Sequence, residues 1–299
     1  MKIINPNPLK KGDTIGVVSP SSPLRSKSID KGIHYLQSMG FNIRFGSHFE
    51  EEDRFLAGSD GNRAKDIMDF FKAPEVKAII VSRGGQGSQR ILPLLDYHII
   101  SKNPKILVGF SDTTALQLGI LKKTGLISYS GYTLTLPLNP LLEKTFLSCL
   151  FNEAYSVQGG QIIHEGIIKG KLVGGNLSLI TSLMGTPYQP DFKNKILLLE
   201  DVGTEPYNID RMISHLDLAG ILVQVSGIVF GQFEDCISKD DTEGTIDDVI
   251  NEWAGRVKVP CLKNFPYSHG VNNCVLPIGS LVTLDASSHS LHINKNSSS

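Results

Sequence analysis

Strand and helix patterns alternate along the first half of the chain, and this alternation restricts the fold more than any other feature of the sequence. Short apolar or β-branched runs predict strands at 14–18, 41–45, 78–82 and 106–110. Apolar residues at helical spacing predict helices at 29–39, 60–72 and 113–123. Such alternation favours right-handed βαβ units, and therefore a parallel sheet that helices cover on both faces.

The pattern changes in the second half of the chain. Strand-like runs at 167–173, 195–199, 228–230, 281–284 and 291–293 are interrupted by helical stretches near 177–184, 210–218 and 246–254. We therefore predict an α/β protein with a second, mixed α+β domain, which suits a chain of 299 residues. The predicted limits are 1–137 for the first domain, 138–165 for a linker and 166–299 for the second domain.

Composition excludes several classes of protein. The chain has 29 Lys+Arg against 30 Asp+Glu, which argues against a basic nucleic-acid footprint over the whole surface. Its apolar runs are strand-sized, and its start lacks the apolar region of a signal peptide. The four cysteines form no CxxC pair, and we find no metal-binding or cofactor motif. We expect a cytoplasmic protein with reduced thiols, no cofactor, no metal, and no nucleic-acid or membrane partner.

Two glycine-containing turns follow predicted strands, where the loops of a parallel sheet form binding sites. Ser111 lies at one of them and is the leading candidate nucleophile, because a serine on a sharp strand-to-helix turn presents its Oγ outward. The segment Gly109-Phe110-Ser111-Asp112-Thr113 lacks the second glycine of the usual nucleophile elbow. Taken alone, Ser111 fits a helix N-cap better than a nucleophile. The other turn, 84–87, fits a phosphate cradle, an oxyanion hole or a simple tight turn.

A serine nucleophile needs a base, and a histidine base needs an acceptor that holds its tautomer. His269 has the most suggestive surroundings, because aromatic, proline and glycine residues indicate a shaped loop around it. Taken alone, the local sequence fits a loop histidine bonded to the backbone better than a catalytic base. Glu200 ends a buried apolar run and needs a partner, which His269 or Arg211 would supply. Alternation along the strand places only one of Glu200 and Asp201 toward a given site.

Seven ordered landmarks resemble the LD-carboxypeptidase family of serine peptidases, which includes microcin C immunity peptidases. They span about 260 residues and favour the catalytic interpretation of all three segments above. The landmarks are LKKGD at 9–13 with SPS at 19–21, FLAG at 55–58 with Arg63, RGGQG at 83–87, GFSD at 109–112, GGNL at 174–177, LEDVG at 199–203 with IDRM at 209–212, and FPYSHG at 265–270.

The resemblance implies a Ser–Glu–His triad of Ser111, Glu200 and His269. It also implies that the backbone N–H groups of Gly85 and Asp112 form the oxyanion hole. The first domain would be Rossmann-like and carry the nucleophile, and the second would carry Glu200 and His269. The site would lie between the domains, commonly in a homodimer.

The family's substrate is a murein peptide that is cut before a terminal D-alanine, which implies hydrolysis of an L,D bond in peptidoglycan recycling. Arg83 is a candidate for the substrate carboxylate, although a buried structural arginine fits it better. Gln86 departs from a common aromatic residue and Thr204 from a common acidic residue, and both departures bear on substrate fit.

Two other functions fit parts of the sequence. A microcin C-type immunity peptidase would keep the triad and cleave peptidyl-aminoacyl nucleotides, with an aromatic side chain stacked on the base. The one tryptophan, Trp253, lies in a predicted helix. A non-catalytic binding protein would keep the two-domain frame, but all three triad residue types stand at the matching positions.

Overall fold

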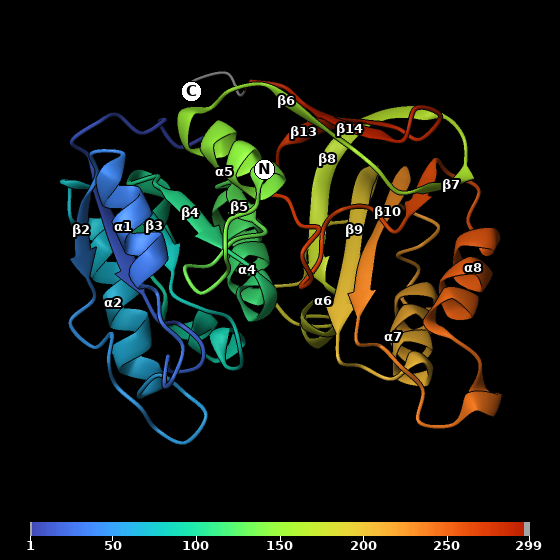
Figure 1. Ribbon diagram of the computed structural model, residues 1–299, viewed down its shortest axis with the longest axis horizontal. Coiled ribbons are helices and arrows are strands. Elements are labelled where there is room, and N and C mark those ends of the chain that lie inside the picture. The colour runs from blue at the N-terminus through green and yellow to red at the C-terminus, as the bar shows by residue number, and fades with distance from the viewer. Residues whose placement is uncertain (1, 296–299) are drawn as a thin grey trace.

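The computed structural model describes residues 2–295, which fold around two β-sheets that stand side by side (Figure 1). The first sheet has the strand order β12-β5-β4-β3-β1-β2. Its strands β1 to β5 are parallel, and β12 is antiparallel to β5. The strands are β1 (Thr14–Val18), β2 (Asn42–Phe45), β3 (Val76–Val81), β4 (Ile106–Gly109), β5 (Ser128–Ser130) and β12 (Leu276–Ile278).

Helices separate successive strands of the first sheet, as the alternating pattern predicts. The helices of this half are α1 (Asp30–Ser38), α2 (Asp60–Lys72), α3 (Tyr97–Lys102) and α4 (Thr114–Thr124), with the short 3₁₀ turns η1 (Ser88–Leu94) and η2 (Ser111–Thr113). The Ser59 side chain accepts a hydrogen bond from the Asn62 N–H and so caps the start of α2. Pro74 follows the end of that helix, because proline cannot continue it.

The second sheet is mixed and has the strand order β6-β14-β13-β8-β9-β10-β11-β7. Its four central strands β8 to β11 run parallel, and antiparallel strands flank them. The strands are β6 (Tyr155–Gln158), β7 (Gln161–His164), β8 (Ile167–Asn176), β9 (Lys195–Val202), β10 (Gly227–Glu234), β11 (Cys261–Lys263), β13 (Leu281–Asp285) and β14 (Ser290–Ile293). The prediction of a parallel first sheet and a mixed second sheet is confirmed.

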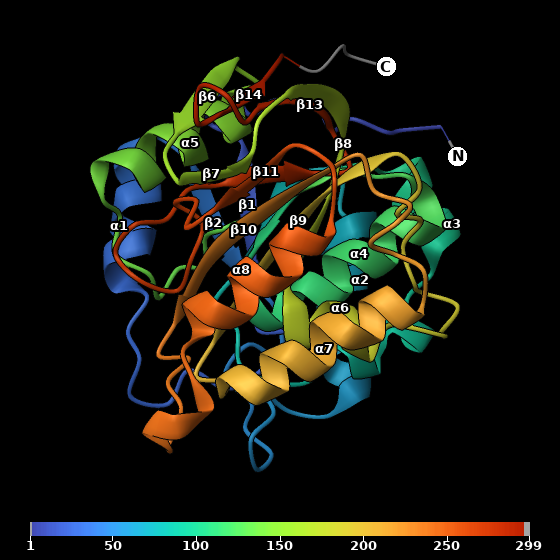
Figure 2. The same cartoon turned by 90° about the vertical axis from the view of Figure 1, so that its right-hand side faces the viewer.

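Three helices and a short 3₁₀ turn complete the second half. The helices are α6 (Leu177–Ser182), α7 (Pro206–Leu218) and α8 (Ile246–Arg256), and the turn is η3 (Asp241–Glu243). Figure 2 shows α7 and α8 on the face of the second sheet that is turned away from the first. The opposite side packs toward α4 and toward β12 of the first sheet.

The segment 138–165 contains helix α5 (Pro140–Phe151) and the strands β6 and β7. The chain then adds β8 to β11 to the second sheet, returns to the first sheet through β12, and completes the second sheet with β13 and β14. The second half of the chain therefore contributes one strand to the first sheet. The domain limits given above stay a prediction.

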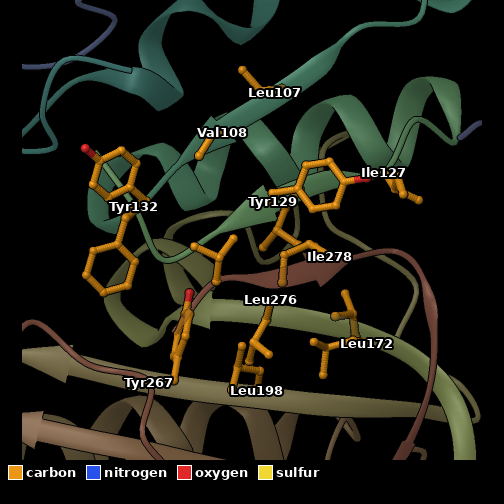
Figure 3. Close-up of a cluster of buried hydrophobic side chains, with 14 of the residues drawn as sticks. Leu107, Val108, Ile127, Tyr129, Tyr132, Leu172, Leu198, Tyr267, Leu276 and Ile278 are labelled. Atoms are coloured by element: carbon orange, nitrogen blue, oxygen red, sulfur yellow. The ribbon is translucent and has the colours of Figure 1, made fainter. Parts of the chain in front are cut away.

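A continuous apolar core lies between the two sheets (Figure 3). Tyr129 and Leu276 contribute from the first sheet, and Leu172 and Leu198 contribute from the second. Burying side chains of this size stabilises a fold by about 1.5–3 kcal/mol each. The core therefore fixes the two sheets relative to each other at the level of the loops that follow their parallel strands. Among residues 2–295, no helix is long and apolar enough to cross a membrane.

Candidate active site

Ser111 occupies a strained turn directly after β4. Its φ is +66°, in the left-handed region that non-glycine residues rarely adopt, and η2 begins at this residue. Such strain persists only where the surrounding structure imposes it, and it is concentrated at functional sites. The turn is a nucleophile elbow in its geometry, although Thr113 replaces the second glycine and donates its hydroxyl to the Phe110 carbonyl at 2.9 Å.

Two glycines give this turn the space that it needs. A Cβ on Gly109 would lie 2.4 Å from Thr113 Oγ1, and a Cβ on Gly84 would lie 2.8 Å from Ser111 Cβ. Carbon atoms do not approach that closely without displacement of one of them. The loop 84–87 is therefore packed against Ser111, which places the exposed backbone of Gly85 beside this turn.

Glu200 and His269 meet in a buried hydrogen bond. Glu200 lies on β9 and is fully buried, and its Oε2 accepts from His269 Nδ1 at 2.8 Å. The Asn176 amide at the start of α6 donates to Glu200 Oε1 at 3.2 Å. Both carboxylate oxygens thus have a donor, and the neutral imidazole keeps its lone pair on Nε2. Arg211 instead donates to the Asn208 side chain, so it is not the partner of Glu200.

The Glu200–His269 pair shifts the protonation of both groups. Burial disfavours a charged imidazole, but the hydrogen bond and negative charge of Glu200 outweigh it and raise the pKa of His269 above the ordinary value of 6.5. Asp201 and Glu234 add to this rise. Burial raises the pKa of Glu200, and the hydrogen bonds from His269 and Asn176 act against that rise. The site therefore favours an imidazolium at His269 more than water does.

His269 is brought beside the nucleophile turn. The ring of Phe110, which precedes Ser111, lies 4.5 Å from the His269 ring, centroid to centroid. Tyr267 holds the same loop to the first sheet, because its hydroxyl shares a hydrogen bond of 2.8 Å with Ser130 Oγ on β5. Figure 3 shows Tyr267 among the side chains between the two sheets. The loop with His269 is thus anchored on the same sheet that carries Ser111.

The structure does not join Ser111 and His269 by a hydrogen bond. His269 Nε2 is buried and has no hydrogen-bond partner among residues 2–295. An orphaned buried nitrogen of this kind calls for an explanation. Catalytic hydrogen bonds are often long in the free enzyme and shorten when substrate binds.

The residues next to Glu200 and His269 differ in their hydrogen-bond partners. Asp201 points away from His269, and its Oδ2 accepts from the N–H and the hydroxyl of Ser178 at 2.9 and 2.8 Å. Only Glu200 of the two carboxylates contacts the imidazole, as strand alternation predicts. Thr204 donates to Asp201 Oδ1 at 3.1 Å. Asn176 was part of a sequence landmark, but no sequence signal showed that its amide reaches Glu200.

The loop after β3 and helix α2 carry the remaining residues of interest. Gln86 is exposed, and its N–H donates to Ser22 Oγ at 3.1 Å. Arg83 is partly buried and donates from Nη1 to the Pro23 carbonyl at 2.8 Å. Arg63 is buried and donates to the Gly87 carbonyl at 3.0 Å and to the Pro20 carbonyl. Local sequence offers no means of telling that this arginine ties the loops after β1 and β3 together.

Comparison with known proteins agrees with this arrangement. The sequence model of the LD-carboxypeptidase N-terminal domain matches residues 15–131, and that of the C-terminal domain matches residues 169–284. The chain is 33% identical over 291 residues to a probable murein peptide carboxypeptidase of Bacillus subtilis strain 168, covering 94% of this chain and 91% of that protein. It is 29% identical to the microcin C7 self-immunity protein MccF of Escherichia coli, covering 96% and 95% of the two chains.

Solved structures share the whole fold. An MccF-like protein from Bacillus anthracis superposes with a TM-score of 0.89 at 32% identity, over 98% of this chain and 100% of that one. A muramoyltetrapeptide carboxypeptidase from Oxalobacter formigenes superposes with a TM-score of 0.86 at 27% identity, over 94% and 98% of the two chains. The full-length match in sequence and in fold shows that this chain belongs to the LD-carboxypeptidase family of peptidases.

Proposed function

We propose that this protein is a serine carboxypeptidase that hydrolyses the L,D bond before the terminal D-alanine of murein tetrapeptides. The observation that carries the proposal is the strained Ser111 turn beside a buried Glu200–His269 pair whose Nε2 has no partner. The murein carboxypeptidases among its relatives support the substrate class. A cytoplasmic role in peptidoglycan recycling, as a homodimer with domains 1–137 and 166–299, belongs to the same proposal.

The chemistry divides into acylation and deacylation. His269 Nε2 takes the Ser111 proton as Oγ attacks the scissile carbonyl carbon, and the carbonyl oxygen becomes an oxyanion. The N–H groups of Gly85 and Asp112 donate to that oxyanion. His269 then protonates the leaving amine of D-alanine, and the C–N bond breaks. Water, deprotonated by His269, attacks the acyl-enzyme, and Ser111 regains its proton as the peptide is released.

Glu200 has two effects in this scheme. Its hydrogen bond to Nδ1 directs the lone pair of Nε2 outward, and its charge stabilises the imidazolium that forms in each step. Full burial of Glu200 strengthens this attraction, because little water screens its carboxylate. Asn176 keeps the second carboxylate oxygen paired and so fixes the plane of the Glu200 carboxylate.

A second candidate keeps the same residues and changes the substrate to a peptidyl-aminoacyl nucleotide. The similarity to MccF favours it. Trp253 does not offer the stacking side chain for such a nucleotide, because it is buried, donates its indole N–H to Asp210 at 2.7 Å and lies under the Arg256 guanidinium. We therefore rank murein peptides first.

The test is release of D-alanine from a murein tetrapeptide by the wild type and by Ser111→Ala. We expect release by the wild type and a loss of about 10⁴-fold or more in the variant, the size of effect seen when a triad residue is removed. Equal release by both would exclude Ser111 as the nucleophile. If the wild type instead cleaves a peptidyl-aminoacyl nucleotide and leaves the tetrapeptide intact, the second candidate is the function.

A further inference from the structure

The carboxylate of Asp112 lies buried beneath the nucleophile turn and accepts three hydrogen bonds. Its Oδ2 accepts from the Ser21 hydroxyl at 2.6 Å and from the Ser88 N–H at 2.8 Å. Its Oδ1 accepts from the Gly87 N–H at 3.1 Å. The three donors lie in the loops after β1 and β3, while Asp112 itself follows β4. One side chain therefore joins the loops of three neighbouring parallel strands.

The loop after β3 is held from both sides at Gly87 and Ser88. The Ser88 hydroxyl donates to the Asp112 carbonyl at 2.5 Å, so Asp112 binds Ser88 through side chain and backbone together. The Arg63 guanidinium donates to the Gly87 carbonyl at 3.0 Å. The Gly87 N–H therefore donates to Asp112, and the Gly87 carbonyl accepts from Arg63. These two hydrogen bonds leave the peptide groups of Gly87 little freedom to rotate.

The residues just before Gly87 are held by fewer hydrogen bonds than Gly87 and Ser88. Gly85 and Gln86 are exposed, and the Gln86 N–H has a single bond to Ser22 Oγ. Gly84 on the other side packs against the Ser111 side chain. The direction of the Gly85 N–H relative to Ser111 is therefore set by where Asp112 holds Gly87 and Ser88.

We propose that the Asp112 carboxylate is the positioning residue of the oxyanion hole. Its side chain holds the loop that carries one oxyanion donor, the Gly85 N–H, against Asp112. The backbone N–H of Asp112 is the other donor. This inference rests on the proposed function, because it assumes that these two N–H groups stabilise an oxyanion. It adds a role for the Asp112 side chain that is separate from the triad and from its backbone.

Asp112→Asn tests this role with little change in shape. An amide has one acceptor oxygen, and its NH₂ group must replace either Oδ1 or Oδ2. The NH₂ group then faces the Gly87 N–H in one orientation and the Ser88 N–H in the other. Ser21 can reverse its hydroxyl, but a backbone N–H cannot become an acceptor. In either orientation the substitution therefore leaves one of these two backbone N–H groups facing another donor, without its hydrogen bond.

We expect Asp112→Asn to lower kcat by roughly 10- to 100-fold with KM within about two-fold, since loss of a complete oxyanion donor lowers kcat by 10²–10³-fold. The rate at which a fluorophosphonate labels Ser111, followed by intact mass, should fall by a similar factor, because the tetrahedral phosphorus adduct uses the same donors. Ser88→Ala, which removes only the bond to the Asp112 carbonyl, should give a smaller fall in both rates. Ser21→Ala, which removes one donor to the Asp112 carboxylate, should also lower both rates and serves as the test if Asp112→Asn does not fold.

Asp66→Asn is the matched control. Asp66 is a buried carboxylate in the same half of the chain, and it accepts from the His48 N–H at 3.0 Å and pairs with His48 Nδ1 at 2.8 Å. We expect this variant to lose stability and keep the wild-type kcat and labelling rate. Thermal unfolding of all variants separates lost stability from a misplaced donor.

The outcomes distinguish this inference from the proposed function. If the wild type releases D-alanine and is labelled, unchanged kcat and labelling rate in Asp112→Asn would overturn the positioning role and leave the triad intact. If Asp112→Asn does not fold, the same result in Ser21→Ala would do so. Equal losses in Asp112→Asn and Asp66→Asn would show a general effect of stability and overturn it as well. A wild type that neither releases D-alanine nor labels at Ser111 would overturn both proposals together.

Discussion

Gly84 has space for a hydrogen atom and for nothing larger. Its absent Cβ would lie 2.8 Å from Ser111 Cβ and 3.1 Å from Ser111 Oγ. In Gly84→Ala, either the loop or the nucleophile must move, and a displacement of about 1 Å at a reacting atom can lower a rate by 10²-fold. We expect kcat for D-alanine release to fall by about that factor.

Gly255→Ala is the control for this prediction. Gly255 lies in α8 with nothing within 4 Å of its absent Cβ. Alanine there should leave kcat unchanged and stabilise the fold by roughly 0.5–1 kcal/mol, because it restricts the unfolded chain. Unchanged kcat in Gly84→Ala would mean that the loop after β3 does not constrain Ser111.

The pH dependence of catalysis should report the charges around His269. In the proposed mechanism the base is the neutral imidazole of His269. The pKa of His269 is raised above 6.5, so kcat/KM should increase with pH through a midpoint above 6.5. Glu234 contributes to that rise and is not the hydrogen-bond partner of His269. Glu234→Gln should therefore shift the midpoint to lower pH and leave the plateau at high pH unchanged. An unshifted or higher midpoint would show that Glu234 does not act on His269 through its charge.

At the scale of the residue, sequence reasoning reaches side chains that stand next to a recognisable turn or in a family motif. Ser111 and the turn 84–87 follow predicted strands, so their shared edge of the sheet was predictable. The partner of Glu200 was not predictable from the residues alone, since Arg211 and His269 satisfied the same requirement. The same limit applies to Asn176 and to the Asp112 carboxylate, because their donors and acceptors come from distant loops.

At the scale of the element, a hydrogen bond between Tyr267 and Ser130 helps to hold the loop that carries His269 to the first sheet. Tyr267 and Ser130 are both buried, and their hydroxyls are 2.8 Å apart. Tyr267→Phe leaves Ser130 without this partner, which should lower the free energy of unfolding by about 1–3 kcal/mol. The double variant Tyr267→Phe/Ser130→Ala should lose less than the sum of the single losses, measured by denaturant unfolding.

The effect of Tyr267→Phe on kcat distinguishes the Tyr267–Ser130 hydrogen bond from one that contributes to stability alone. Tyr97 also donates its hydroxyl, to the Leu92 carbonyl at 2.7 Å, but it lies in α3 away from the His269 loop. Tyr97→Phe should cost comparable stability and leave kcat intact, whereas Tyr267→Phe should lower kcat as well. Strictly additive stability losses in the double variant would argue against a direct Tyr267–Ser130 coupling.

The elements themselves were largely predictable, because periodicity is local. The helix at 60–72 and the strand at 14–18 have the predicted limits. Helix α5 was not predicted, since it is apolar on most of its surface and shows little of the amphipathic spacing that the prediction relies on. Strand β12 was also missed, because a strand of three residues carries almost no pattern.

At the scale of the whole molecule, β12 links the two halves of the chain in a way that local patterns cannot show. It pairs with β5 as the antiparallel edge of the first sheet, although six of the eight strands of the second sheet precede it in the chain. Its Leu276 and Ile278 are fully buried, and they cover the core that the two sheets share (Figure 3). Ser111 follows β4, and His269 lies in the loop between β11 and β12, so the site requires both halves in place.

We therefore expect the predicted first domain, 1–137, not to fold stably when it is expressed alone. Without β12 the fragment exposes the edge of β5 and the apolar residues beneath it, and an open apolar strand edge promotes aggregation. The near-ultraviolet circular dichroism of the fragment should lack the fixed aromatic signal of the full chain. Co-expression with 138–299 should restore that signal together with D-alanine release, because the second fragment returns β12 to the sheet. A soluble 1–137 fragment with native-like aromatic dichroism would instead show that β12 is dispensable and that the two halves fold independently.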